Sequence, residues 1–184
     1  MVGSHRFLPA RHRTWVGVSM SNSILPVLLV AVCLGGLTGL RAFTPIAVLA
    51  WGLHLRYMHI PGSSLHFLHV WAAAVILTIL AFGEIAIDKM PSTPSRLKPP
   101  GTIGRIVFGF ICGMVSGQAW GANWAISAIA GLVGAILGAL LGYEVRKGWV
   151  HTFHWHDLPV ALIEDLVCIG GSILVVSRAV FLAY

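Results

Sequence analysis

Most of this chain consists of apolar segments separated by short polar connections. The segments cover residues 24–40, 42–55, 65–87, 103–120, 124–143 and 158–177. A soluble domain usually has about a quarter charged residues, whereas this chain has 10% charged and 57% hydrophobic residues and a mean hydropathy of +0.86. So few charges cannot cover a surface that faces water. The sequence therefore predicts an all-α, multi-pass transmembrane helical bundle of five to six membrane segments.

The 184 residues suit one bundle, and we divide them into a basic N-terminal leader, residues 1–23, and a single transmembrane domain, residues 24–184. The leader need not be ordered. Its basic residues followed by an apolar run also describe a signal peptide, but no small-x-small cleavage site follows. Met20 is an alternative to Met1 as the start of translation, and in that case the leader is an annotation artefact.

The segment 42–55 is too short to cross a bilayer as an upright helix. Its 14 residues would span about 21 Å, against a hydrocarbon core about 30 Å thick. We expect it to be short or re-entrant. If it does not cross, the leader, the connection after residue 88 and the pair Arg146-Lys147 lie on one side, which loop charge assigns to the cytoplasm. This predicts five full spans, with a cytoplasmic N-terminus and the C-terminus outside.

Glycines recur at helical spacing in three segments. They are Gly35, Gly36 and Gly39, then Gly109, Gly113 and Gly117, then Gly131, Gly134, Gly138 and Gly142. Lipid provides little hydrophobic force between helices, so small residues that allow close backbone contact mark helix interfaces. We favour packing within the chain, while a homodimer through the same stripes stays open.

Two similar patterns predict a weak inverted repeat. Glycine pairs followed by an arginine end the segments 24–40 and 124–143, and each is followed by a segment with a carboxylate, Glu84 or Glu164. In the five-span topology the paired segments run in opposite directions, which is typical of transporters.

Carboxylates within or near the apolar segments are the first candidates for a functional site. Glu84 and Asp88 are four residues apart and share a helix face, while Glu164 and Asp165 lie about two turns into the last segment. Ionisable groups within a membrane are costly and are often functional. They could bind a cation, relay protons or hold a substrate amine, with Arg41 or Arg105 as counter-charge. Alternatively, they are ion pairs that lock helix ends, and Arg41 reaches the interface.

Histidines suggest a metal site in one place. His151, His154 and His156 form a His-x-x-His-x-His array that could supply three ligands. The neighbouring Trp149 and Trp155 are, however, typical of membrane-interface anchors, so an interfacial connection is the alternative interpretation.

Other functional classes find little support. The basic residues are scattered between apolar segments, which argues against nucleic-acid binding and is typical of loops beside anionic lipids. Cys33, Cys112 and Cys168 form no CxxC pair and are expected to be small buried side chains. No hydrolase, phosphate-loop, dinucleotide or metalloprotease motif occurs, so we expect neither an enzyme nor a cofactor.

Four stretches resemble a known family. They are Gly-Leu-Arg-Ala-Phe-Thr-Pro at 39–45, the run at 82–96 that contains Asp-Lys-x-Pro-x-Thr-Pro-x-Arg, Pro-Gly-Thr-Ile-Gly-Arg at 100–105 and Leu-Pro-Val-Ala-Leu-Ile-Glu-Asp at 158–165. They are similar to bacterial membrane proteins catalogued as domain of unknown function 4126. The resemblance implies a bacterial inner (plasma) membrane location and no established activity. It emphasises Arg41, Glu84, Asp88, Arg96, Arg105, Glu164 and Asp165 without giving them roles.

Two functions follow as hypotheses. The first is a small transporter or channel-like protein that uses the intramembrane carboxylates. The second is a structural or accessory subunit of a larger membrane complex, which the glycine stripes and the missing reaction motifs favour. A lipid-modifying enzyme would need a metal or nucleophile constellation that the sequence does not contain.

Overall fold

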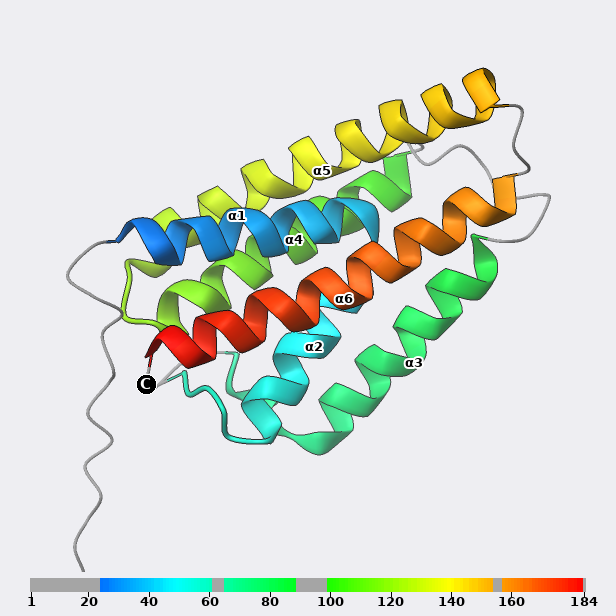
Figure 1. The fold of residues 1–184 in the computed structure, drawn as a ribbon. Helices are drawn as coiled ribbons and strands as arrows, with labels where there is room; N and C mark the ends of the chain where they lie inside the picture. The colour runs from blue at the N-terminus through cyan, green and yellow to red at the C-terminus, as the bar shows by residue number, and fades with distance from the viewer. Residues whose placement is uncertain (1–23, 61–64, 89–98, 154–156, 184) are drawn as a thin grey trace, which may run out of the picture.

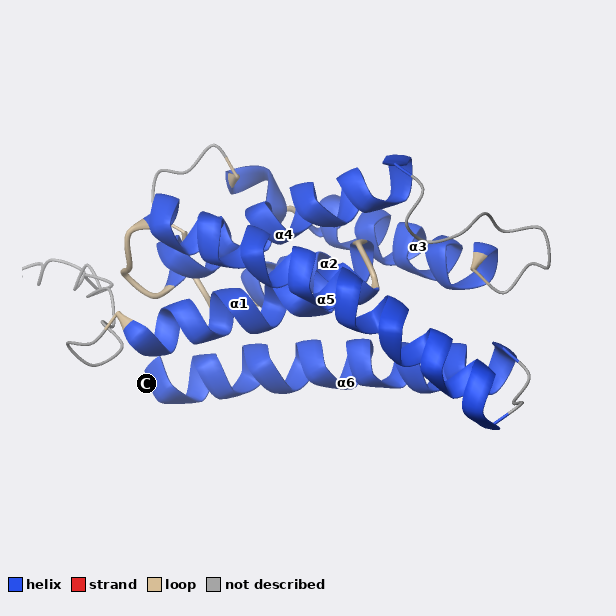
Figure 2. Cartoon of the chain, turned by 90° about the horizontal axis from the view of Figure 1, so that it is seen from above, coloured by secondary structure: helices blue, strands red, loops and turns tan. Residues whose placement is uncertain are grey.

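The computed structural model describes residues 24–60, 65–88, 99–153 and 157–183, and in these residues the chain forms helices and no strands (Figure 1). The helices are α1 (Leu25–Leu40), α2 (Phe43–His54), the short 3₁₀ helix η1 (His66–His69), α3 (Trp71–Ile87), α4 (Pro99–Ala119), α5 (Trp124–Phe153) and α6 (Asp157–Ala183). Figure 2 shows the same helices from a perpendicular direction. The predicted all-α bundle is confirmed.

Local sequence explains where these helices begin and end. A proline occupies the first turn of α1, where its missing N–H would have no helical partner. Arg41 has an extended backbone, with φ −138° and ψ 116°, and separates α1 from α2. Gly121 has a φ of +74° in the turn before α5, and the side-chain oxygen of Asn123 accepts hydrogen bonds from the N–H groups of Ala125 and Ile126 at 2.9 and 3.3 Å.

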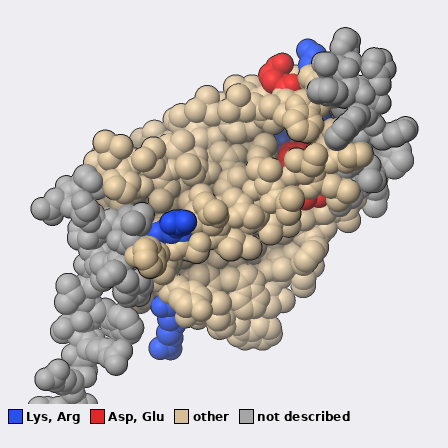
Figure 3. Space-filling model, in the orientation of Figure 1, with Lys and Arg blue, Asp and Glu red and all other residues tan. Residues whose placement is uncertain are grey.

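Three described helices are long and apolar enough to cross a membrane, namely 101–119, 124–149 and 159–181. The other three, α1, α2 and α3, are apolar but shorter. The 12 residues of α2 would rise about 18 Å, so the expectation of a short helix after Arg41 is confirmed. Many large apolar side chains are exposed on the described surface. On the face in Figure 3, charged residues gather toward the two ends, and surface without charged residues lies between them.

Helices α1, α4 and α5 pack closely through their glycines, and we call them the glycine core. A Cβ at Gly35 would overlap the backbone of Gly131, and a Cβ at Gly138 would overlap the backbone of Gly36. A Cβ at Gly113 of α4 would overlap the carbonyl oxygen of Ser127 on α5 and would lie 3.0 Å from the backbone of Gly131. The stripes thus serve packing within the chain, as the sequence indicated, while a homodimer stays a prediction.

The direction of α5 corrects the inverted repeat. Gly35 lies beside Gly131, Gly36 beside Gly138 and Leu40 beside Gly142, so the residue numbers rise together and α1 and α5 run parallel. The expectation that these two segments run in opposite directions is wrong. Its cause is α2, which reverses the chain after Arg41 and so adds one change of direction to the five-span topology (Figure 1).

Helices α2, α3 and α6 form a second group around the glycine core. α3 packs mainly on α2, and α6 packs on α1 and α2 with little contact to α5. α1 begins and α6 ends at the same end of the molecule (Figure 1). The five-span expectation placed these two points on opposite sides, and the reversal at α2 is again the reason.

Candidate functional site

Arg41 carries the only arginine side chain in the described residues that is fully buried. It follows the last turn of α1, and its backbone N–H donates to the carbonyl of Leu37 at 2.9 Å. The extended backbone at this residue turns the guanidinium inward instead of continuing the helix. An uncompensated guanidinium in an apolar interior costs several kcal/mol or more. The position therefore requires negatively charged partners.

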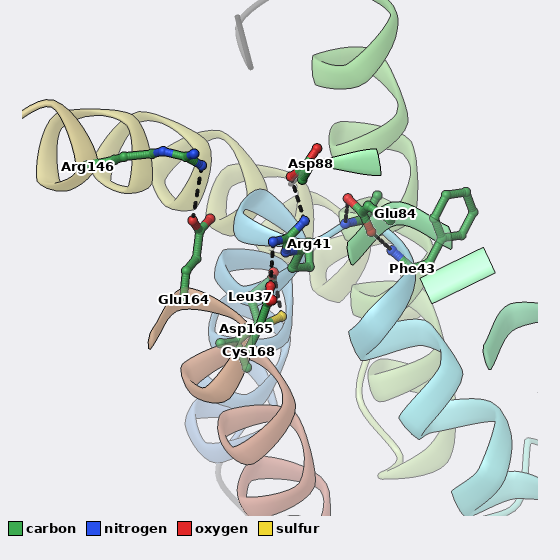
Figure 4. Close-up of polar contacts among 10 residues, drawn as sticks. Leu37, Arg41, Phe43, Glu84, Asp88, Arg146, Glu164, Asp165 and Cys168 are labelled. Atoms are coloured by element: carbon green, nitrogen blue, oxygen red, sulfur yellow. Dashed lines mark hydrogen bonds and ion pairs between the residues drawn. The ribbon is translucent and has the colours of Figure 1, made fainter. Parts of the chain in front are cut away.

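Two aspartates from different helices supply that compensation (Figure 4). Nη1 of Arg41 donates to Oδ2 of Asp88 at 2.5 Å, at the C-terminal end of α3. Nη2 forms an ion pair with Oδ1 of Asp165 on α6. The two carboxylates are themselves only 13% and 9% exposed. One guanidinium thus joins the end of α1 to α3 and to α6.

Glu84 has a different role, because it caps α2. Its Oε1 accepts the N–H of Ala42 at 2.9 Å, and its Oε2 accepts the N–H of Phe43 at 3.1 Å (Figure 4). The first N–H groups of a helix have no partner within it, and an anion there also interacts favourably with the helix dipole. Since Asp88 lies one turn later, one face of α3 provides the cap for α2 and a partner for Arg41.

A second ion pair lies beside these contacts. Nη1 of Arg146 on α5 is 3.9 Å from Oε2 of Glu164 on α6, and both side chains are partly exposed, at 18% and 10%. Cys168, one turn after Asp165, donates its S–H to the carbonyl of Leu37 at 3.4 Å. α6 is therefore attached at this end through Glu164, Asp165 and Cys168.

Arg105 of α4 is also buried, at 7% exposed, one turn before Gly109, which lies beside Thr38 of α1. The buried or half-buried side chains here comprise four carboxylates, Glu84, Asp88, Glu164 and Asp165, and three guanidinium groups, Arg41, Arg105 and Arg146. We call these seven residues the Arg41 cluster. If all are ionised, the cluster has an excess of one negative charge.

The sequence identified six of these residues as candidates and included Arg146 as a loop charge and as a partner in ion pairs that lock helix ends. Two features needed the structure. Arg41 was expected to contact the interface or to serve as a counter-charge, and only the fold shows it enclosed by Asp88 and Asp165. The capping contacts of Glu84 also had no signal beyond its spacing from Asp88.

Other predicted site residues are not part of this cluster. Arg96, His154 and His156 lie outside the described residues, and His151 lies on α5 in a stretch whose side chains are not described. Within 24–60, 65–88, 99–153 and 157–183, no three His, Cys, Asp or Glu residues are arranged to hold a metal ion. Of the cysteines, Cys112 and Cys168 are buried as expected, but Cys33 is exposed.

A histidine group lies at the opposite end of the bundle, around η1. The rings of His66 and His69 stack with centroids 4.9 Å apart, and His59 meets His69 edge to face at 5.5 Å. Nδ1 of His54 is 3.1 Å from the carbonyl oxygen of His69. Burial lowers the pKa of His69, and the neighbouring His66 and His59 lower it further, although a backbone hydrogen bond at His66 opposes this.

Comparison with known proteins gives a family and nothing finer. No curated protein and no solved structure matches the chain. A family model with the description "Domain of unknown function (DUF4126)" matches residues 28–183, which include both the glycine core and the Arg41 cluster. The chain therefore belongs to the DUF4126 family.

Proposed function

We propose that this protein is an integral membrane protein that moves a proton or a small cation, with the Arg41 cluster as its exchange site. The membrane part rests on three long apolar helices, three shorter ones and the apolar side chains exposed between the two charged ends. The transport part rests on one observation: a buried guanidinium is held by two carboxylates from two different helices, where α3 and α6 meet the glycine core.

The charge of the cluster selects the class of substrate. Four carboxylates face three guanidinium groups, and an excess negative charge in a poorly polar environment favours binding of a cation or a proton. Asp88 and Asp165 share one partner. A cation that binds either of them therefore competes with Arg41, whose contact with α3 or α6 is then weakened.

The packing gives this competition a mechanical effect. α6 has little contact with α5, and α3 packs mainly on α2. The contacts of Arg41 attach one end of α3 and of α6 to the end of α1, whereas the rest of α6 packs on α1 and α2. Exchange of a cation at Asp88 or Asp165 would let the outer helices move while the glycine core stays fixed.

Measurements of electrical current on proteoliposomes test the proposal. Jumps in pH, Na⁺ or small organic amines across a solid-supported membrane should give charge transfer, and Asp88→Asn or Asp165→Asn should reduce it at least tenfold. Glu144→Gln is the matched control, because Glu144 is an exposed acid on α5 near the same end. Folded Asp88→Asn and Asp165→Asn variants that both keep the wild-type current would contradict the proposal.

A second candidate is a structural or accessory subunit of a larger membrane complex. The supporting observation is that each cluster carboxylate contacts an arginine or a backbone N–H, which is what ion pairs that lock helix ends require. Gentle extraction from native membranes distinguishes the two. Recovery as a lone monomer or homodimer argues against the subunit role, and a stable complex with absent currents supports it.

Orientation in the membrane stays a prediction. In the sequence, Lys89, Arg96 and Lys98 follow α3, Arg105 lies on α4, and Arg146 and Lys147 lie on α5, whereas the leader arginines precede α1, Arg56 follows α2 and Arg178 lies near the end of α6. Loop charge is thus nearly balanced. A reporter fused to the C-terminus tests the cytoplasmic N-terminus, because α1 begins and α6 ends at the same end.

A further inference from the structure

A groove of about 250 Å³ separates α5 from α6 near the Arg41 cluster. It exists because these two helices hardly touch. Gly142 and Leu40 also line it, and the missing side chain of Gly142 leaves room for a methyl group of Leu40, which a Cβ there would approach to 2.5 Å. Aliphatic residues line most of it, with Leu141 and Val145 from α5 and Val160, Ile163 and Val167 from α6. An apolar groove of this kind suits a hydrocarbon chain.

Charged side chains of opposite sign line the groove as well. Arg146 comes from α5 and Glu164 from α6, and in Figure 4 they point toward each other across the gap between the helices. Nη1 of Arg146 lies 3.9 Å from Oε2 of Glu164, so the groove presents a cationic and an anionic group side by side. Trp149 lies one turn beyond Val145 in the same lining, and tryptophan is typical of the headgroup level of a bilayer.

We propose that this groove binds one phosphatidylethanolamine molecule, with an acyl chain between α5 and α6, its phosphate at Arg146 and its ammonium group at Glu164. The arrangement of the charges selects the headgroup. The phosphate of an anionic lipid would gain from Arg146 but would also lie near Glu164. Ethanolamine offers N–H donors to the carboxylate, whereas the quaternary ammonium of a choline lipid has none.

The proposal goes beyond transport and depends only on the helices lying in a bilayer. Binding can therefore be measured in detergent, where no flux is needed. The probes are phosphatidylethanolamine, phosphatidylglycerol and phosphatidylcholine with identical acyl chains, titrated into purified protein and counted by native mass spectrometry. The wild-type protein should bind one phosphatidylethanolamine more tightly than either of the others.

Neighbouring residues on α6 provide matched pairs of variants. Val167 and Ile163 line the groove, whereas Leu166 and Leu162 do not and are 72% and 48% exposed. Val167→Trp and Ile163→Trp should fill the groove and weaken phosphatidylethanolamine binding about tenfold, as the loss of roughly two buried methylene groups would. Leu166→Trp and Leu162→Trp should bind like the wild type. Because two groove positions are substituted, the test remains valid if one of the variants does not fold.

Headgroup selection is tested at the two charges. Arg146→Gln should weaken binding of both phosphatidylethanolamine and phosphatidylglycerol, whereas Glu164→Gln should reduce the preference for the first over the second. Equal binding by Val167→Trp and Leu166→Trp, or a wild-type protein that prefers phosphatidylglycerol or phosphatidylcholine, would overturn the proposal. If the protein binds phosphatidylethanolamine as expected but gives no transport current, the result would count against the transport function alone.

Discussion

The glycine core and the outer helices are held together by different physics. In the core, backbones approach so closely that a single Cβ would overlap the neighbouring chain at several positions. The outer helices α3 and α6 are instead joined to it at one end by the ion pairs of Arg41 and Arg146, and α6 also packs along α1. Closely packed backbones cannot separate slightly without losing their contacts, whereas an ion pair can break and form again. The comparison indicates that any motion belongs to the outer helices.

The largest effect is expected from Arg41→Gln, which leaves Asp88 and Asp165 buried without their cation. Removal of one partner from a buried ion pair costs about 3–5 kcal/mol, so the melting temperature in detergent should fall far below that of the wild type. Adding Asp88→Asn and Asp165→Asn to this variant should restore part of the loss. Strictly additive effects of the three changes would show that the residues are not coupled.

A substitution inside the glycine core should cause a smaller loss of stability. In Gly138→Ala the new methyl group meets the backbone of Gly36, which cannot turn away as a side chain could. Overpacking of this kind costs about 1–3 kcal/mol. Gly170→Ala on α6 is the control, because no heavy atom lies within 4 Å of a Cβ placed there. Equal melting temperatures of the two variants would remove the distinction between core and outer helices.

Glu84→Gln tests whether the outer helices can be loosened without an effect on the glycine core. An amide keeps one acceptor oxygen for the N–H groups of Ala42 and Phe43 but loses the charge and the second acceptor. Loss of a helix cap costs about 0.5–2 kcal/mol. Hydrogen exchange should accelerate in the first turn of α2 and not in the glycine core. Glu144→Gln should leave both regions unchanged.

The smallest effect should appear at the other end of the outer helices, in the pH dependence of stability. The pKa of His69 is lowered from 6.5, so above about 6.5 its neutral form is present both folded and unfolded and has no effect. As the pH falls below that value, the unfolded chain takes up the proton first, and the protein is destabilised. Melting curves between about pH 5 and 8 should show a shallower acid slope for His69→Phe. An unchanged slope would mean that other groups cause it.

The sequence predicted the helices better than their arrangement. Long apolar runs indicate the number and approximate limits of the helices, and the short apolar run at 42–55 predicted that α2, with 12 residues, would be short. The direction of each helix did not follow, because α2 and its return had been treated as a partial insertion. In lipid the outside of a helix is as apolar as its inside, so periodicity could not show which helices are neighbours.

The same limit applies to the Arg41 cluster. Glu84 and Asp88 could be placed on one face of a helix because that relation is local. The contact between Arg41 and Asp165 joins residues from opposite ends of the chain, and no spacing rule contains it. The residue types thus identified the candidates, whereas their partners and the capping by Glu84 depended on the tertiary fold.

The position of Arg41 also has a consequence for biogenesis. The residue leaves the ribosome directly after α1, but Asp88 comes 47 residues later and Asp165 arrives only with the last helix. During synthesis a guanidinium at the end of the first helix must therefore stay in contact with water or headgroups until both aspartates have been made. Final burial of the α1–α2 junction becomes one of the last events of assembly, and a chain truncated before α6 should leave that junction accessible to water-soluble reagents.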